Sequence, residues 1–317
     1  MSRLILPAVG GDPVLEKDYD LTLGDDDVRV AIDAAPINPA DQLFMLGWFG
    51  VYPKVPNQLG AEGTGRVVAA GSQADRSLVG RRVIVLPTFV HGTWASEVVV
   101  PAAKVVAVPD ADPIQLAMLA VNPATAYALL HDYVTLRPGD WVGLTVANSG
   151  VGQNLIALAK RAGLKVLAVV RSESAAARVH ADIVLVDGDD LAARIGETKL
   201  RVIYDGGAPD LSKLLPALEN GGTVVSFSAV TGESQTIPYP DLFYRDVRQR
   251  GFYIIRWVEQ TPRAELVRVY TELASLVADG TLKVDVEATY PLSAYREALQ
   301  DAGKDGRTGK VLFTPQA

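Results

Sequence analysis

The chain has no cysteine among its 317 residues and only 3 histidines. The first absence excludes disulfides, thiolate catalysis and cysteine-based zinc sites. Positive charge is also scarce, because the net charge is −7 and no basic cluster occurs, so nucleic acid is not an expected partner. No apolar run is long enough to span a membrane, and the N-terminus lacks the charged start of a signal peptide. We therefore expect no membrane partner and predict a cytoplasmic protein.

What is present is typical of a globular protein, with 49% apolar and 21% charged residues. A chain of 317 residues exceeds what one hydrophobic core usually serves, so two domains are expected. Residues 1–112 contain short valine-rich segments separated by Gly or Pro, which indicates a compact β-barrel-type domain. Within it, residues 34–65 carry few strand signals, and such a long loop is usually functional.

From residue 113 the pattern becomes an alternation of strands and helices, which indicates a doubly wound α/β domain with a parallel six-stranded sheet at 113–256. The clearest helices are expected at 154–162 and 210–218. Residues 257–317 do not continue the alternation and are predicted to return to the first domain. The expected strands are 141–146, 165–170, 183–186, 202–205, 223–227 and 251–255.

The loop after the first of these strands carries the strongest single signal. An apolar run ends at Val146, small residues follow, and a helical pattern begins at Asn154. A strand, a tight turn of small residues and a helix direct free backbone N–H groups at a pyrophosphate. The alternative interpretation is an ordinary strand-to-helix turn. The predicted cofactor contacts in this loop are Asn148, Ser149, Gly150, Val151 and Gly152.

The end of the second strand bears on the choice of cofactor. NAD enzymes usually place Asp or Glu there to bind the ribose hydroxyl. Here Arg171 takes that place, and a guanidinium binds a phosphate in a forked geometry. The residue therefore favours NADPH. Two observations count against it: Glu173, an acidic residue, lies two positions further on, and Arg171 can instead be a plain solvated charge.

Several motifs together resemble the medium-chain dehydrogenase/reductase superfamily, and the resemblance extends over essentially the whole chain. It implies a GroES-like first domain and a Rossmann second domain. Zinc-dependent members carry a histidine where this chain has Ala61, before Glu62, and they need a cysteine ligand, so the resemblance implies a zinc-free branch with no metal site. Glu62 is then expected to be a structural hydrogen-bonding residue. The motifs are Asn-Pro-Ala-Asp at 38–41, Leu-Gly-Ala-Glu-Gly-Thr-Gly at 59–65, Val-Asn-Pro-Ala-Thr-Ala-Tyr at 121–127, the loop at 148–153, Arg-Gly-Phe-Tyr-Ile-Ile-Arg-Trp at 250–257 and Gly-Lys-Val-Leu-Phe-Thr at 309–314.

Within this branch the chain resembles the mitochondrial-type 2-enoyl thioester reductases, and also the NADPH:quinone oxidoreductases. In the former, NADPH gives hydride to Cβ of the enoyl group, and a tyrosine after the Asn-Pro motif is expected as donor. This chain has Phe49 in that place, which cannot donate a hydrogen bond. Tyr52 and His91 are the candidate catalytic donors. The alternatives are that Tyr52 only anchors the loop, that His91 is a structural histidine, and that the proton comes from water.

The leading hypothesis is an NADPH-dependent reductase of an activated double bond in a small-molecule substrate. A quinone reductase is the first alternative, and an NADPH-binding protein without turnover is the second. A homodimer formed by edge pairing through residues 252–255 is usual in the family. The resemblance further implies cofactor contacts at Thr125, Ser228, Tyr253 and Lys310, and a substrate pocket with Asn38, Trp48, Phe49 and Trp257.

Overall fold

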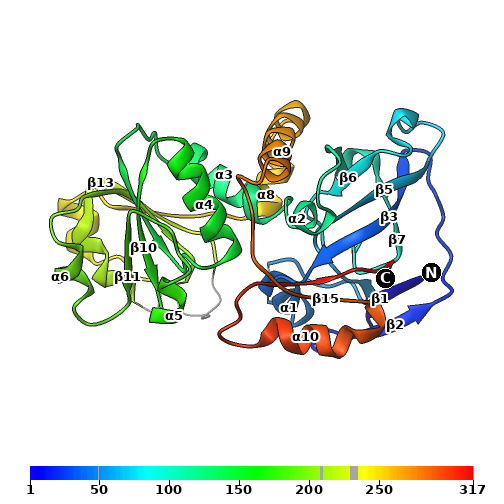
Figure 1. The fold of residues 1–317 in the computed structure, drawn as a ribbon, viewed down its shortest axis with the longest axis horizontal. Helices are drawn as coiled ribbons and strands as arrows, with labels where there is room; N and C mark the ends of the chain where they lie inside the picture. Colours follow the sequence, from blue (N-terminus) through cyan, green and yellow to red (C-terminus); the bar gives the residue numbers. More distant parts are fainter. Residues whose placement is uncertain (49, 208–209, 229–234, 317) are drawn as a thin grey trace. The chain divides into compact units, whose positions relative to one another are not determined.

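The computed structural model describes residues 1–48, 50–207, 210–228 and 235–316. The chain divides into two compact units, the first made of residues 1–124 and 258–317 and the second of residues 125–257. Both ends of the chain lie in the first unit (Figure 1). The expected discontinuous organisation is present, with the first boundary 12 residues later than the predicted residue 112.

The first unit is built on β-sheets that are mainly antiparallel. A seven-stranded sheet has the order β15-β16-β3-β5-β6-β8, with β7 paired to β3, and a smaller sheet has the order β2-β1-β4. This is the GroES-like architecture that the sequence predicted. The strands are β1 (Ser2–Leu6), β2 (Val14–Lys17), β3 (Asp27–Pro36), β4 (Asn57–Gln58), β5 (Gly63–Ala70), β6 (Arg82–Val85), β7 (Glu97–Pro101), β8 (Val105–Ala107), β15 (Val286–Tyr290) and β16 (Lys310–Phe313).

Strand β3 organises this unit, because it pairs with both β5 and β7. Its residues alternate between buried and half-buried, with Val28, Val30 and Ile32 fully buried, which is the period-two pattern of a strand that covers a core with one face. Opposite it, Gly65 lies so close that an added Cβ would sit 2.0 Å from the Ala31 carbonyl oxygen. Only glycine allows the two backbones to approach in this way.

The C-terminal segment returns to the first unit, as predicted. Helix α9 (Arg263–Ala278) places the Tyr270 hydroxyl 2.9 Å from the carbonyl oxygen of Ala120. The side chain of Gln115 exchanges two hydrogen bonds with the backbone of Val284. These bonds hold residues 113–121 in the first unit, which explains the later boundary. The other helices of this unit are α1 (Pro39–Met45), α2 (Pro113–Ala117), α10 (Tyr295–Gly303) and the short turns η1 (Arg76–Leu78), η2 (Ala102–Lys104) and η5 (Leu292–Ala294).

The second unit is a Rossmann fold, as predicted. Its six-stranded sheet has the order β11-β10-β9-β12-β13-β14, and every neighbouring pair is parallel. The order reverses between β9 and β12, which creates the switch point where doubly wound sheets bind ligands. The strands are β9 (Trp141–Thr145), β10 (Lys165–Val170), β11 (Ile183–Val186), β12 (Leu200–Asp205), β13 (Leu218–Ser226) and β14 (Arg248–Gly251).

Helices cover both faces of this sheet, with α4 on one side and α6 on the other in Figure 1.

The sequence-based prediction of two elements of this unit is wrong. The helix at 210–218 is replaced by two 3₁₀ turns, since Pro216 removes a backbone donor. The strand at 251–255 is replaced by β14 and, after it, α8 (Ile254–Gln260). The remaining helices are α3 (Asn122–Asp132), α4 (Gly150–Arg161), α5 (Glu173–Ala176), α6 (Leu191–Ile195), η3 (Leu211–Lys213), η4 (Leu215–Ala217) and α7 (Tyr239–Tyr244).

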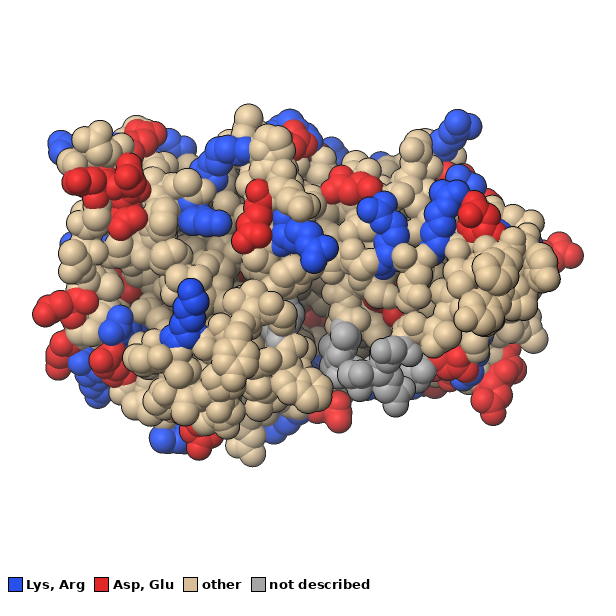
Figure 2. All heavy atoms as spheres, turned by 180° about the vertical axis from the view of Figure 1, so that it is seen from behind, with Lys and Arg blue, Asp and Glu red and all other residues tan. Residues whose placement is uncertain are grey.

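In the part of the chain that the structure describes, every helix is too short or too polar to cross a bilayer. On the face drawn in Figure 2, basic and acidic side chains are interspersed, and neither sign forms a continuous patch. This distribution agrees with the absence of a basic cluster in the sequence, whose net charge is −7.

Candidate functional site

The loop between β9 and α4 forms a cradle for an anion. Ser149 caps α4, because its hydroxyl accepts the N–H of Gly152 at 3.1 Å. The first two amides of the helix, at Gly150 and Val151, have no partner within the helix. They lie at the positive end of a helix of 12 residues, the usual position of a bound phosphate.

Gly152 explains why the cradle needs a small residue at its third position. A Cβ there would lie 2.4 Å from the carbonyl oxygen of Ala147. Contact this close is sterically impossible, so any larger residue would push α4 away from the turn. The predicted loop residues therefore form one structure: Asn148 and Ser149 turn the chain, and Gly150, Val151 and Gly152 open the helix. The residues present fit the phosphates of a dinucleotide.

Val146 begins this turn in an unusual conformation. Its φ is +50°, in the left-handed region that a β-branched residue rarely adopts. The turn is closed by a hydrogen bond of 2.9 Å from the Ser149 N–H to the Val146 carbonyl. A Cβ on Gly206 would lie 3.2 Å from the Cβ of Val146, so the valine side chain lies beside the glycine that follows β12. Backbone strain therefore sits at the switch point of the sheet.

Arg171 lies directly after β10, at the carboxyl edge of the sheet, and its side chain is exposed. Among the described residues its guanidinium has no hydrogen bond or ion pair. Ser172 caps the following turn and contacts the Ser174 hydroxyl at 3.0 Å. The end of β10 thus presents an exposed cation followed by two hydroxyl groups, and its role in phosphate binding stays a prediction.

The other predicted cofactor residues are dispersed around this unit and the first. Thr125 is buried in α3, Ser228 follows β13, and Tyr253 lies between β14 and α8 with its own contacts. Trp257 lies on α8 and donates its indole N–H to Asp132 at 2.7 Å. Their cofactor and substrate roles stay predictions.

The first unit holds a buried polar network that spans four segments of the chain. The Asn38 side chain donates to one oxygen of Glu62 at 2.9 Å and accepts from the Lys310 ammonium at 2.6 Å. The other Glu62 oxygen accepts the Val121 N–H at 2.8 Å. The Asp41 carboxylate accepts the N–H groups of Asn38 at 2.8 Å and Ala61 at 2.9 Å.

Burial shifts the proton affinities in this network. Glu62 and Asp41 are 0% and 1% exposed. Burial raises the pKa of Asp41 to about 7, although the N–H donors of Asn38 and Ala61 oppose the shift. Burial also raises the pKa of Glu62, and it lowers that of Lys310. Glu62 is therefore a structural hydrogen-bonding group, in agreement with the sequence interpretation. Asn38, predicted to line the substrate pocket, has both ends of its amide engaged in the network.

Tyr52 and Trp48 lie in the loop of the first unit that was expected to meet the substrate. Their side chains are 69% and 73% exposed. Gly47, with φ of +76°, lies against the Tyr52 ring, since an added Cβ would be 3.1 Å from it. Phe49, which occupies the position of the expected tyrosine, lies outside the described residues.

His91 is half-buried in the same unit. Burial lowers its pKa below the ordinary value; Asp27 opposes this shift and Lys104 adds to it. The imidazole is therefore neutral at pH 7, where it keeps one N–H hydrogen-bond donor but is a weak acid. No hydrogen bond connects it to Tyr52 or to the Asn38 network in the described part of the chain, so the two candidate donors are not brought together by a direct bond.

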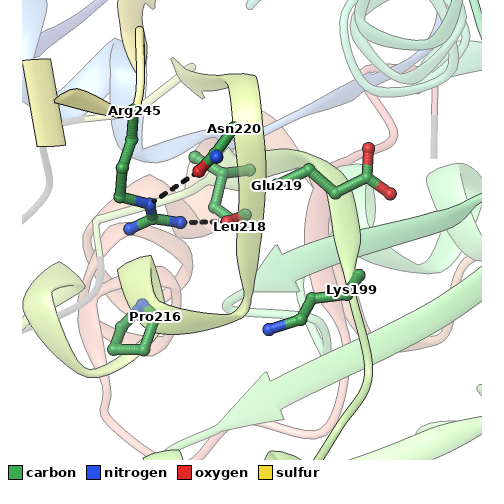
Figure 3. Close-up of a pocket in the computed structure, with 6 residues that line it drawn as sticks. All are labelled: Lys199, Pro216, Leu218, Glu219, Asn220 and Arg245. Carbon is green, nitrogen blue, oxygen red and sulfur yellow. Dashed lines mark hydrogen bonds between the residues drawn. The ribbon is translucent and has the colours of Figure 1, made fainter.

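A pocket of the second unit lies away from the cradle. It has a volume of about 470 Å³ and lies at the amino ends of β12 and β13, the edge opposite the cradle (Figure 3). Its Arg245 guanidinium is occupied by the carbonyls of Leu215 and Leu218 and by Asp241. The Arg245 side chain is therefore held by the protein itself. It is lined by Lys199, Pro216, Leu218, Glu219, Asn220 and Arg245.

Sequence reasoning missed Asp41 and the extent of the buried network. The signal for Asp41 was available, because an acidic residue three positions after Asn38 at a helix start is a capping pattern. The burial of Glu62 had no such signal. Within the described ranges, no three His, Cys, Asp or Glu side chains lie close enough to hold a metal ion.

A β-rich unit with a six-stranded Rossmann unit carrying a phosphate cradle is the architecture of a nicotinamide-dependent oxidoreductase. Two family models match the chain: the alcohol dehydrogenase GroES-like domain at residues 24–110 and the zinc-binding dehydrogenase at residues 150–271. The chain belongs to the medium-chain dehydrogenase/reductase superfamily. It is an oxidoreductase that uses a nicotinamide cofactor.

Relatives and solved structures agree with this assignment. The mitochondrial enoyl-[acyl-carrier-protein] reductase of Xenopus tropicalis is 33% identical over 88% of this chain and 84% of its own. The quinone oxidoreductase of Pseudomonas syringae pv. tomato DC3000 is 27% identical, covers 99% of each chain and has a TM-score of 0.87. The quinone oxidoreductase of Escherichia coli, solved with NADPH, is 25% identical, covers 99% of this chain and all of its own, and has a TM-score of 0.88.

Proposed function

We propose that this chain is an NADPH-dependent reductase that transfers hydride to an activated C=C bond, in a 2-enoyl thioester or an enone, without a metal ion. The observation that carries the proposal is the cradle at Ser149–Gly152 together with the exposed Arg171 at the end of β10. The cradle suits the pyrophosphate, and Arg171 suits the additional phosphate that distinguishes NADPH from NADH.

The chemistry of an enoyl acceptor suits a chain without a metal site. When NADPH is bound, its nicotinamide supplies the hydride, and the negative charge that develops on the acceptor collects on the carbonyl oxygen. The protein must orient the acceptor, exclude water and provide donors near that oxygen. Tyr52 is the proposed donor, because its hydroxyl can donate a hydrogen bond and its side chain lies exposed in the loop that was expected to meet the substrate. Water is the alternative source of the proton.

The mitochondrial enoyl reductases support this substrate class through their sequence similarity. A quinone is the second candidate, and a specific observation favours it. Phe49 replaces the tyrosine expected of a thioester reductase, and quinone reduction can draw its protons from solvent. The third candidate, a protein that binds NADPH without turnover, rests on the same replacement of the expected tyrosine by Phe49.

A panel of acceptors separates the three functions. Purified protein is mixed with NADPH and crotonyl-CoA, a simple enone or a benzoquinone, and oxidation is followed at the absorbance of the reduced cofactor. Turnover of crotonyl-CoA and the enone supports the proposal, and turnover of the quinone alone supports the second candidate. Tight NADPH binding with no oxidation by any acceptor would leave only the non-catalytic function.

Tyr52→Phe tests the donor, and Tyr244→Phe is a control because Tyr244 is a similarly exposed tyrosine on the second unit. A loss of kcat confined to Tyr52→Phe supports its role. Equal activity of both variants shows that the proton comes from elsewhere.

The proposal includes a homodimer and a cytoplasmic location. Strand β14 pairs only with β13 in the described sheet, and all of its residues are exposed, so its edge can accept a second copy. This moves the expected pairing from residues 252–255 to residues 248–251. Three aromatic side chains on the preceding α7, Tyr239, Phe243 and Tyr244, are also exposed. Sedimentation velocity at micromolar concentration should give the mass of two chains; one chain would refute the pairing.

A further inference from the structure

The two central strands of the second unit part just after their last ladder pair. In the described sheet, β9 and β12 pair as far as Leu144 and Tyr204. Thr145 and Asp205 come next, and the first pairs with β10 whereas the second pairs with β13. These two residues therefore stand on opposite sides of the switch point, where the halves of the sheet diverge.

Side-chain hydrogen bonds join these two residues where the ladder ends. The Thr145 hydroxyl donates to the Asp205 carboxylate at 2.7 Å and accepts the N–H of Gly206 at 2.8 Å. The same carboxylate oxygen accepts the N–H of Gly207 at 3.2 Å. Thr145 and Asp205 are each 1% exposed, so the loss of either partner leaves a buried polar group unsatisfied. We call this set of bonds the Thr145–Asp205 clasp.

The clasp lies directly before the strained residue of the cofactor turn. Val146 follows Thr145 and has a φ of +50°, which a valine adopts only where the surrounding structure enforces it. Gly206, whose N–H the clasp holds, also borders Val146, since an added Cβ on the glycine would lie 3.2 Å from the valine Cβ. The clasp thus fixes both the residue before Val146 and the glycine beside it.

The conformation of Val146 decides where the cradle begins. Its carbonyl accepts the N–H of Ser149 at 2.9 Å, and the Ser149 hydroxyl caps α4 by accepting the N–H of Gly152. The amides at Gly150 and Val151 follow the cap directly. A relaxed Val146 would move this carbonyl, and the cap and the two amides would move with it.

We infer that Thr145 and Asp205 are positioning residues for the cofactor, because they hold Val146 in its left-handed conformation and thereby set the amides that bind the pyrophosphate. Neither side chain has to touch the cofactor for this role. The inference deepens the proposed function and rests on it for NADPH as the ligand.

Thr145→Val tests the clasp, because it removes the hydroxyl and keeps the shape of the side chain. Quenching of tryptophan fluorescence in the full chain should show the dissociation constants of NADPH and NADH each raised roughly tenfold. The factor is the same for both cofactors because both carry the pyrophosphate, whereas the loss of Arg171 should affect NADPH alone. Thr145→Ser retains the hydroxyl and should bind both cofactors within about threefold of the wild type. Affinities of Thr145→Val within about twofold of the wild type would overturn the inference.

A second substitution tests whether the effect passes through Val146. Asparagine tolerates a φ of +50° without an external restraint, so Val146→Asn should return the NADPH affinity of Thr145→Val to within about threefold of the wild type. It should not rescue Arg171→Ser, whose defect lies elsewhere. If the double variant binds as weakly as Thr145→Val, the inference fails. If Thr145→Val alone does not fold, the comparison of Val146→Asn with the double variant still decides, because the inference requires these two to bind NADPH equally well.

Thr64→Val is the matched control for a merely structural loss. Thr64 is fully buried in β5, and its hydroxyl donates to the Val83 carbonyl at 2.8 Å. This variant should lower the free energy of unfolding as Thr145→Val does and leave both dissociation constants unchanged. With an acceptor that is turned over, Thr145→Val should raise the KM for NADPH and leave kcat at saturating NADPH nearly unchanged, whereas a loss of folded protein lowers kcat at constant KM.

The outcomes separate this inference from the proposed function. If the wild type binds neither cofactor, the proposed function fails. If the wild type binds NADPH and Thr145→Val binds it equally well, only this inference fails. If Thr64→Val weakens binding as much as Thr145→Val does, the effect is a general loss of stability, and the inference is again overturned.

Discussion

Gly152→Ala is the perturbation that the cradle predicts most sharply. The new Cβ would lie 2.4 Å from the Ala147 carbonyl oxygen and 2.8 Å from the Ala147 Cα, both of them backbone atoms. Ordinary contact needs about 1 Å more, so α4 must move away from the turn by roughly that distance. Overpacking of this kind costs about 1–3 kcal/mol of stability.

The same movement displaces the amides at Gly150 and Val151 that form the phosphate site. A misplacement of about 1 Å can reduce binding or rate by on the order of a hundredfold. Chemical denaturation measures the stability, and quenching of tryptophan fluorescence measures NADPH binding. Gly303→Ala is the control, since a Cβ at Gly303 meets only the Gln42 amide nitrogen at 3.7 Å. If Gly152→Ala binds NADPH within twofold of the wild type, the close approach has no functional role and the cradle argument is wrong.

Three further predictions concern separate features. Arg171→Ser should weaken NADPH binding by roughly ten- to a hundredfold and leave NADH binding within twofold, as measured by titration of both cofactors; equal weakening of both would contradict it. Val146→Asn should raise the free energy of unfolding by about 1 kcal/mol, because asparagine tolerates a φ of +50°. A lower free energy of unfolding than that of the wild type, measured by chemical denaturation, would refute this. The raised pKa of Asp41, about 7 when folded against 3.8 unfolded, means that the folded state holds an extra proton between those values. Stability should therefore fall as pH rises from 4 to 7, and the slope, measured by denaturation across that range, should shrink in Asp41→Asn.

The Rossmann unit could be predicted because its signals are local. The strands β9, β10 and β11 were bounded within one residue, since each is an apolar run followed by small or polar residues. Strand β14 was missed because it is an exposed edge strand whose sequence, Arg-Gln-Arg-Gly, has no apolar period. Of the apolar residues 252–255 that resembled a strand, Ile254 and Ile255 begin the helix α8, and Phe252 and Tyr253 precede it.

The candidate site was predicted unevenly for a similar reason. The cradle residues could be found because a helix start and its small residues are contiguous in sequence. The network of Asn38, Asp41, Glu62 and Lys310 could not, because it joins segments up to 272 positions apart through hydrogen bonds. Sequence motifs identified Asn38 and Glu62 as notable residues, yet only the fold shows that an amide separates Glu62 from Lys310.

The central claim, that this chain binds the phosphorylated nicotinamide cofactor through the β9–α4 cradle and Arg171, is tested most directly by the ratio of two dissociation constants. NADPH and NADH are titrated into the wild-type chain under identical salt and pH. The structure predicts that NADPH binds at least tenfold more tightly. Equal affinity for the two cofactors would contradict the assignment of Arg171, and the absence of binding by either would contradict the site as a whole.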